Sequence, residues 1–222
     1  MIHVLYRLLA GENKRERPEW YSKHNCFSSL LANIGQGIDL RIFLNGGECD
    51  WLPDFVHTTR VNIPVISESF LLVYHEALLF PRWDWVYFCE DDYLHVPGAL
   101  FKLQNCIEDV KPDLVSLYDH PDRYRDLPEH NYTQGKNDIF ISRNHHWRTI
   151  PSTCMTFGAS VKVLRENQDL FEKWTYVDFE LFPRLLGFKE DRPNKYLMVG
   201  AIPSLATHCQ TDYLAPCVEW SP

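Results

Sequence analysis

Short, largely apolar segments alternate with amphipathic stretches along the first half of the chain. The segments at 2–9, 39–44 and 84–89 are bounded by polar or turn-forming residues, which is typical of strands in a mainly parallel sheet. Between them, residues 19–35 and 67–80 repeat apolar side chains at helical spacing. The alternation of strand and helix predicts an α/β fold, with a mainly parallel central sheet and helices on both faces.

The second half continues this pattern with one long interruption. Its predicted elements are a helix after Pro97, strands at 113–118, 153–158 and 196–202, a helix capped by Ser160 that runs to about Trp174, and a helix beginning at Asp178. A polar stretch at 119–148 interrupts the alternation, and a stretch that long inside a compact domain is usually functional. No repeat, linker or low-complexity segment divides the sequence. We therefore expect residues 1–222 to form one domain.

Charge and cysteine content limit the partners and the cellular compartment expected for the protein. Its 22 basic and 30 acidic residues give a net charge of −8, so no basic surplus exists for a nucleic-acid partner. The seven cysteines include no CxxC pair and favour a reducing compartment. No stretch approaches the roughly 18 apolar residues of a transmembrane segment, and the first ten residues do not read as a signal peptide. We expect a cytoplasmic protein, at most peripheral to a membrane.

Candidate chemistry begins where the predicted strand at 84–89 ends. Glu90, Asp91 and Asp92 follow it directly, and three adjacent carboxylates repel one another unless positive charge is present. A divalent metal with bound phosphates would supply that charge. The carboxyl ends of strands are where α/β sheets bind ligands, so a ligand site is favoured over the alternative, a solvated acidic turn.

Four further residues could complete such a site. Asp178 and Glu180 stand at the start of a predicted helix, where they could act as a general base or merely serve as an N-cap and a first-turn acid. His208 follows the predicted strand at 196–202 and could be a ligand or a structural histidine. Arg7, near the end of the first strand, could reach a phosphate or lie on the surface.

The order of these residues resembles the nucleotide-sugar glycosyltransferases of the GT-A fold. The resemblance rests on an acidic motif after a strand, Glu90-Asp91-Asp92, then a carboxylate at a helix start and a late histidine. The motif is written DxD in that family, and the form EDD found here is common among inverting members. The resemblance implies a single Rossmann-like GT-A domain that binds Mn²⁺ or Mg²⁺ through Asp92, with Glu90 and Asp91 facing the nucleotide or ordering the loop.

The same resemblance implies an activity. It is the transfer of a sugar from a nucleoside-diphosphate sugar to a hydroxyl of a glycan or another acceptor, with metal dependence and inversion at the anomeric carbon. Asp178 or Glu180 would be the base that takes the proton of the acceptor. His208 would contact the metal or the diphosphate, and Arg7 the diphosphate or the base of the donor.

Two other functions remain open on the sequence. A sugar-phosphate nucleotidyltransferase also uses carboxylate-bound metal, but the glycine-rich loop expected after its first strand is absent, since residues 10–15 contain one glycine. A non-catalytic domain that binds a nucleotide or a glycan is the alternative from a different class. Loss of metal-dependent nucleotide binding on Asp92→Ala would favour the enzyme over this binding domain.

Overall fold

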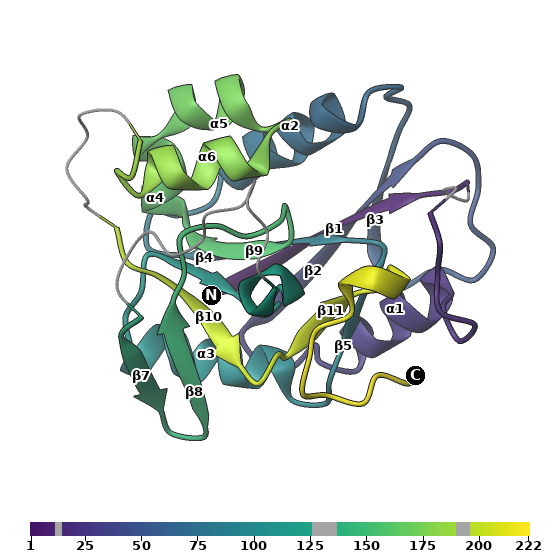
Figure 1. The fold of residues 1–222 in the computed structure, drawn as a ribbon. Helices are drawn as coiled ribbons and strands as arrows, with labels where there is room; N and C mark the ends of the chain where they lie inside the picture. The colour runs from purple at the N-terminus through teal and green to yellow at the C-terminus, as the bar shows by residue number, and fades with distance from the viewer. Residues whose placement is uncertain (12–14, 126–136, 190–195) are drawn as a thin grey trace.

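The structure, a computed structural model, describes residues 1–11, 15–125, 137–189 and 196–222 (Figure 1). Its strands are β1 (Ile2–Leu9), β2 (Ile38–Asn45), β3 (His57–Val61), β4 (Trp85–Glu90), β5 (Tyr93–His95), β6 (Leu114–Ser116), β7 (Ile139–Ser142), β8 (His145–Thr149), β9 (Phe157–Ser160), β10 (Met198–Ile202) and β11 (Ala206–His208). Its helices are α1 (Lys23–Leu31), α2 (Ile66–Ala77), α3 (Ala99–Asp109), α4 (Val161–Glu166), α5 (Gln168–Trp174) and α6 (Asp178–Leu185), with short 3₁₀ helices η1 (Pro121–Tyr124) and η2 (Thr211–Tyr213).

Within these described residues, nine strands form one sheet in the order β3-β2-β1-β4-β9-β6-β10-β8-β7. The first four are parallel, as are β6 and β10, whereas β9 and β8 run against their neighbours. The other seven strands point in one direction, so the predicted mainly parallel sheet is confirmed. The carboxyl ends of β1, β4 and β6 consequently meet at one edge, where such sheets bind ligands.

Helices cover both faces of this sheet, as predicted (Figure 1). Phe27 of α1 and Leu103 of α3 belong to the hydrophobic core on one face. Phe70 of α2, Phe171 of α5 and Phe182 of α6 belong to the core on the other face, together with residues of α4. The sheet is thus the middle layer of three, and its ligand-binding edge lies between the two helical layers.

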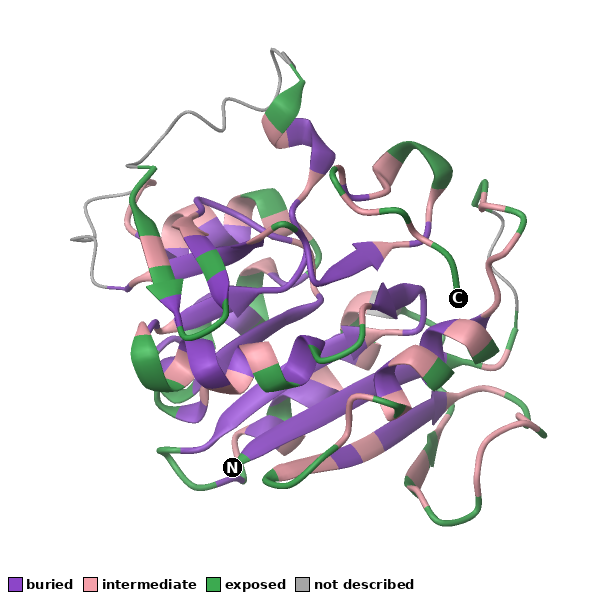
Figure 2. Cartoon of the chain, turned by 90° about the horizontal axis from the view of Figure 1, so that it is seen from below, coloured by how far each residue is buried: buried purple, intermediate pink, exposed green. Residues whose placement is uncertain are grey.

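The central strands are mostly apolar because both of their faces are buried (Figure 2). In β1, Val4 and Tyr6 pack into the core of α1 and α3, whereas Leu5 packs into the opposite core. In β4, Tyr87 and Phe88 divide between the two cores in the same way. Successive side chains of a strand point to opposite faces, which explains the unbroken apolar runs in the sequence.

Tertiary contacts shift several predicted boundaries. The strand predicted at 153–158 is β9 and begins only at Phe157. Ser160 caps α4 as predicted, but the helix breaks at Asn167, whose amide donates to the Val163 carbonyl at 2.8 Å and to the Tyr196 hydroxyl at 2.9 Å. Strands β3, β5, β7, β8 and β11 were not predicted. The polar stretch at 119–148 contains β8, and residues 126–136 of that stretch lie outside the described part of the chain.

His95 lies in β5, and its burial makes the stability of the protein depend on pH. The residue is 4% exposed, and its Nε2 lies 2.9 Å from the Tyr87 hydroxyl. Burial lowers the pKa of His95 to about 4 from an ordinary 6.5. Between these two values the unfolded chain binds more protons than the folded one. Stability is therefore expected to fall by about 3 kcal/mol as the pH drops from about 6.5 to 4.

Urea unfolding of the wild type and of His95→Gln at several pH values measures this effect. The variant is expected to lose most of the pH dependence over this interval. His75→Gln is the control, because the His75 side chain is 52% exposed. An unchanged pH profile in His95→Gln would show that His95 is not held neutral by burial.

Candidate active site

The three predicted acids lie at the carboxyl end of β4, and Asp91 and Asp92 are buried. Each acid has its own cationic partner at 2.9 Å: Arg7 for Glu90, Lys23 for Asp91 and Arg17 for Asp92. The solvated acidic turn considered as an alternative is therefore wrong. The positive charge that three adjacent carboxylates require is supplied here by side chains of β1, α1 and the segment between them.

Arg7 and Glu90 meet because of strand register. They are directly paired residues of the parallel strands β1 and β4, so their side chains leave the sheet on the same face. The Arg7 guanidinium also lies over the Phe70 ring, 5.3 Å from its centre. Arg7 is only 8% exposed, so the alternative of a surface arginine is wrong.

Asp91 faces inward, toward the start of the chain. Its Oδ2 accepts from the Leu9 backbone N–H at 2.9 Å and lies 2.9 Å from Lys23 Nζ. Lys23 in turn donates to the carbonyls of Leu9 at 2.7 Å and Gly11 at 2.5 Å. Burial raises the pKa of Asp91, and the Lys23 charge partly opposes this rise. Of the two roles predicted for Asp91, these contacts correspond to ordering the loop after β1.

Asp92 and His208 are 116 residues apart in the sequence, yet His208 Nε2 lies 3.0 Å from Asp92 Oδ2. The pairing of β11 with β5 brings them together, since His208 is opposite Tyr93, and the two rings stack with centres 5.3 Å apart. Burial alone would raise the pKa of Asp92, but the hydrogen bond and charge of His208, together with Arg17, lower it well below its ordinary value.

Asp92 and His208 can be tested for fit to the implied metal. Among the residues described, no group of three or more His, Cys, Asp or Glu side chains forms a complete metal site. A carboxylate oxygen and an imidazole nitrogen nevertheless converge within 3.0 Å. Magnesium in nucleotide sites is commonly held by one or two carboxylates plus substrate phosphates and water. The pair therefore fits an ion whose remaining ligands come from a diphosphate.

A cavity of about 570 Å³ opens beside Arg7 and Glu90. Its apolar wall includes Phe70 and Met155, and the charged residues Arg7, Glu90 and Asp178 also line it. Within the described structure, Arg7 Nε and Thr175 Oγ1 have no hydrogen-bond partner, but both atoms are buried and are not exposed in this cavity. Its volume lies within the roughly 300–1,000 Å³ typical of ligand sites.

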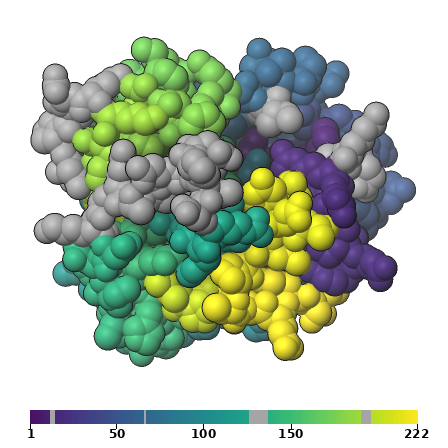
Figure 3. Space-filling model, viewed as in Figure 1, coloured from purple at the N-terminus to yellow at the C-terminus, as the bar shows by residue number. Residues whose placement is uncertain are grey.

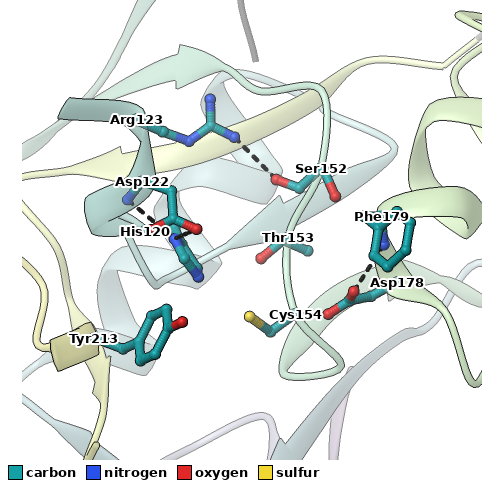
Figure 4. A pocket seen from close by; sticks show the side chains of 9 residues that line it. All are labelled: His120, Asp122, Arg123, Ser152, Thr153, Cys154, Asp178, Phe179 and Tyr213. Atoms are coloured by element: carbon teal, nitrogen blue, oxygen red, sulfur yellow. Dashed lines mark hydrogen bonds and ion pairs between the residues drawn. The ribbon is translucent and has the colours of Figure 1, made fainter. Parts of the chain in front are cut away.

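A second cavity, of about 190 Å³, is lined by residues 152–154 together with residues of η1, α6 and η2 (Figure 4). His120 and Tyr213 form one end, and Phe179 lies at the opposite end beside Asp178. Its lining mixes aromatic rings with the side chains of Asp122, Arg123, Ser152 and Thr153. This cavity is smaller than a typical drug-sized site.

Asp178 lines both cavities. It is the first residue of α6, whose N-cap is Val177 with no capping side chain, so the predicted alternative of an Asp178 N-cap is wrong. Glu180 stands two residues further on, where it pairs with Arg184 at 2.9 Å and with Lys189 at 2.5 Å. The lining of neither cavity includes Glu180. The structure thus separates the two carboxylates that the sequence proposed as the base.

The sequence interpretation missed the cations that face the acids. Lys23 was part of a predicted helix, and residues 11–18 were regarded only as a polar loop. Arg17 Nη1 donates to the Cys209 carbonyl at 2.7 Å, and Arg15 Nη1 lies 3.2 Å from His208 Nε2. Figure 3 shows this N-terminal segment beside the C-terminal segment on one face of the molecule. The available signal was the density of basic residues directly after β1.

Known proteins resemble this chain in architecture rather than in sequence. No protein-family profile and no curated protein matches the sequence. Among solved structures, S. aureus TarS 1–349 matches with a TM-score of 0.54 and 12% identity over 90% of this chain. Full-length S. aureus TarS matches with a TM-score of 0.52 and 11% identity over 90% of this chain and 36% of TarS.

The TarS comparison identifies the fold. TarS is a glycosyltransferase, so this chain has a Rossmann-like, GT-A-like glycosyltransferase fold. A complex of TarS 1–349 with UDP-GlcNAc also matches, with a TM-score of 0.50 and 10% identity. The chain spans 57% of the length of TarS 1–349. Among the helices described here, none combines the length and apolar character needed to cross a bilayer.

Proposed function

We propose that this chain is a glycosyltransferase that moves a sugar from a nucleoside-diphosphate sugar to a hydroxyl acceptor, with inversion. The observation that carries the proposal is the position of Asp178, in the lining of both cavities. A base for this reaction must reach the acceptor hydroxyl and the anomeric carbon of the donor together. A carboxylate at the boundary between a donor cavity and an acceptor cavity meets that requirement.

The cavity beside Arg7 is the proposed donor site. Its lining combines the charged residues Arg7 and Glu90 with the apolar surface of Phe70 and Met155. A nucleoside combines a flat base with polar edges, so it suits a cavity of this mixed character. A complex of the structural neighbour TarS 1–349 with UDP also matches, with a TM-score of 0.50 and 11% identity, which supports a nucleotide-sugar donor here.

The cavity between Phe179 and Tyr213 is the proposed acceptor site. In the proposed reaction the Asp178 carboxylate takes the proton of the acceptor hydroxyl while its oxygen bonds to the anomeric carbon. The bond from that carbon to the diphosphate breaks, and its electron pair leaves with the nucleoside diphosphate. Attack from the side opposite the leaving group inverts the configuration.

The departing diphosphate requires positive charge. Arg7, Arg15 and Arg17 supply part of it from the described chain. Asp92 and His208 would hold a divalent ion, Mn²⁺ or Mg²⁺, which when bound would neutralise charge on the leaving group. Glu90 keeps Arg7 in place at the wall of the donor cavity, and Asp91 anchors the end of β1.

Nucleotide binding is the first expectation to test. A thermal-shift screen of UDP-, GDP- and dTDP-sugars, each with Mn²⁺ and with EDTA, should raise the melting temperature with at least one donor. Saturation at 100 times the dissociation constant stabilises the native state by about 2.7 kcal/mol, which corresponds to a shift of roughly 5 °C or more for a chain of this size.

Two arginine variants make the screen specific. Arg7→Gln removes a charge from the wall of the donor cavity and should lose most of the shift. Arg143→Gln is the matched control, because Arg143 is an exposed residue paired with Asp109, whose Oδ1 lies 2.9 Å from Arg143 Nη2. The absence of a shift with every nucleotide, in folded wild-type protein, would contradict the proposed function.

A further inference from the structure

Two arginines cover the two atoms proposed to bind the metal. We name residues 15–17 the arginine strap. Arg17 Nη2 lies 2.9 Å from Asp92 Oδ2, and Arg15 Nη1 lies 3.2 Å from His208 Nε2. His208 Nε2 and Asp92 Oδ2 are themselves 3.0 Å apart. The strap therefore occupies the position from which a metal ion would approach both of its ligands.

The strap is held in this position by more than one contact. The Arg17 side chain is 9% exposed, donates to the Cys209 carbonyl at 2.7 Å, and lies over the Tyr21 ring at 4.6 Å. Charge-assisted hydrogen bonds of this kind are among the stronger ones in proteins. A cation approaching Asp92 must therefore compete with a buried guanidinium rather than with water.

The two arrangements exclude each other. Asp92 Oδ2 already has Arg17 Nη2 at 2.9 Å and His208 Nε2 at 3.0 Å, and Arg15 Nη1 lies 3.2 Å from His208 Nε2, so a metal ion bound between Asp92 and His208 would lie against both guanidiniums. The like charges of the metal and the guanidiniums would also repel at this range. The diphosphate of the donor offers several acceptor oxygens, which arginine recognises well. It could therefore take up the guanidiniums that the metal displaces.

We propose that the arginine strap holds the cation position of Asp92 and His208, and that a divalent metal binds there only when the diphosphate of the donor draws Arg15 and Arg17 away. This inference rests on the proposed function and adds the coupling between its two ligands. Metal and nucleotide then strengthen each other's binding by the same factor, as linkage requires. In the absence of nucleotide, the wild-type protein binds the metal weakly.

Mn²⁺ binding measured without turnover tests this coupling. The free aquo ion is followed by electron paramagnetic resonance while Mn²⁺ is titrated into wild type, Arg17→Gln and Arg143→Gln. Without nucleotide, Arg17→Gln is expected to bind Mn²⁺ about tenfold more tightly than wild type, within the usual range of coupling energies. Arg143→Gln should match wild type. Adding Asp92→Asn to Arg17→Gln should remove the gained binding.

The second arm repeats the titrations with UDP and with GDP. One of them should tighten Mn²⁺ binding to wild type by about tenfold or more, and should do so much less in Arg17→Gln. Equal Mn²⁺ affinities of wild type and Arg17→Gln without nucleotide would overturn the proposal. Should Arg17→Gln fail to fold, as judged by circular dichroism, Arg15→Gln at the exposed end of the strap provides the same comparison.

A failure of this inference can be told from a failure of the proposed function. Absence of Mn²⁺ binding to every variant, even with nucleotide, would overturn both the strap and the metal ligands. A nucleotide-induced thermal shift that persists in EDTA would then leave the donor site standing. Strong Mn²⁺ binding to wild type without nucleotide would overturn the strap alone and retain Asp92 and His208 as ligands.

Discussion

Asp178→Asn is expected to lower the rate of sugar transfer by roughly 10²–10⁴-fold, the usual contribution of a positioned general base. The amide keeps the size of the side chain but cannot take a proton from the acceptor. Donor binding should survive, because the charged contacts of the donor cavity come from Arg7 and Glu90. The measurement is the release of nucleoside diphosphate, with water and with a panel of hydroxyl acceptors, beside a thermal-shift titration of the donor.

Glu180→Gln is the matched comparison. The two carboxylates share the first turn of α6, but Glu180 pairs with Arg184 and Lys189. The Lys189 hydrogen bond lowers the pKa of Glu180, with Arg184 contributing and burial opposing the shift. A carboxylate held in its charged form by two cations is a weak base. We expect this variant to retain activity within a few fold; a large loss here together with an active Asp178→Asn would reverse the assignment.

Lys23→Met is expected to destabilise the fold by roughly 3–5 kcal/mol, the usual cost of removing one partner of a buried ion pair. The Lys23 side chain is 6% exposed and that of Asp91 is 11% exposed. Removing the ammonium leaves Asp91 as an uncompensated buried charge, and it also removes the donor to the carbonyls of Leu9 and Gly11. Urea unfolding at neutral pH measures the loss.

The same pair allows a double-mutant cycle. Lys23→Met with Asp91→Asn removes both charges and should recover part of the stability lost in Lys23→Met.

The stability lost in Lys23→Met should also become smaller as the pH is lowered. Burial already raises the pKa of Asp91 above its ordinary value, so the folded state binds more protons than the unfolded state. Stability then falls as the pH rises through this raised pKa.

Two results would argue against this account of Lys23. A loss below about 1 kcal/mol would indicate that the pair is worth no more than an exposed one. A deficit that is independent of pH, with no recovery in the double variant, would assign the whole effect to the lost contacts with the carbonyls of Leu9 and Gly11 rather than to the charge of Asp91.

The sheet was largely predictable because its signal is local. The strands β1 and β4 are apolar along most of their length, and such runs can be recognised without any knowledge of their partners. β8 escaped recognition because its burial depends on a few side chains such as Trp147, which is fully buried and donates to Ser142 Oγ at 2.9 Å. A polar sequence with one buried tryptophan has no periodicity that marks a strand.

The sequence alone determined that an acidic motif follows a buried strand, and therefore that Glu90, Asp91 and Asp92 lie at the edge of the sheet where its parallel strands end. Position at the end of a strand is a local property. Tertiary structure alone decided the partners of these acids. Arg17 and Asp92 are 75 residues apart and His208 and Asp92 are 116 apart, and pairings at such distances depend on how the strands associate. The role of Asp178 at the boundary of two cavities has the same origin.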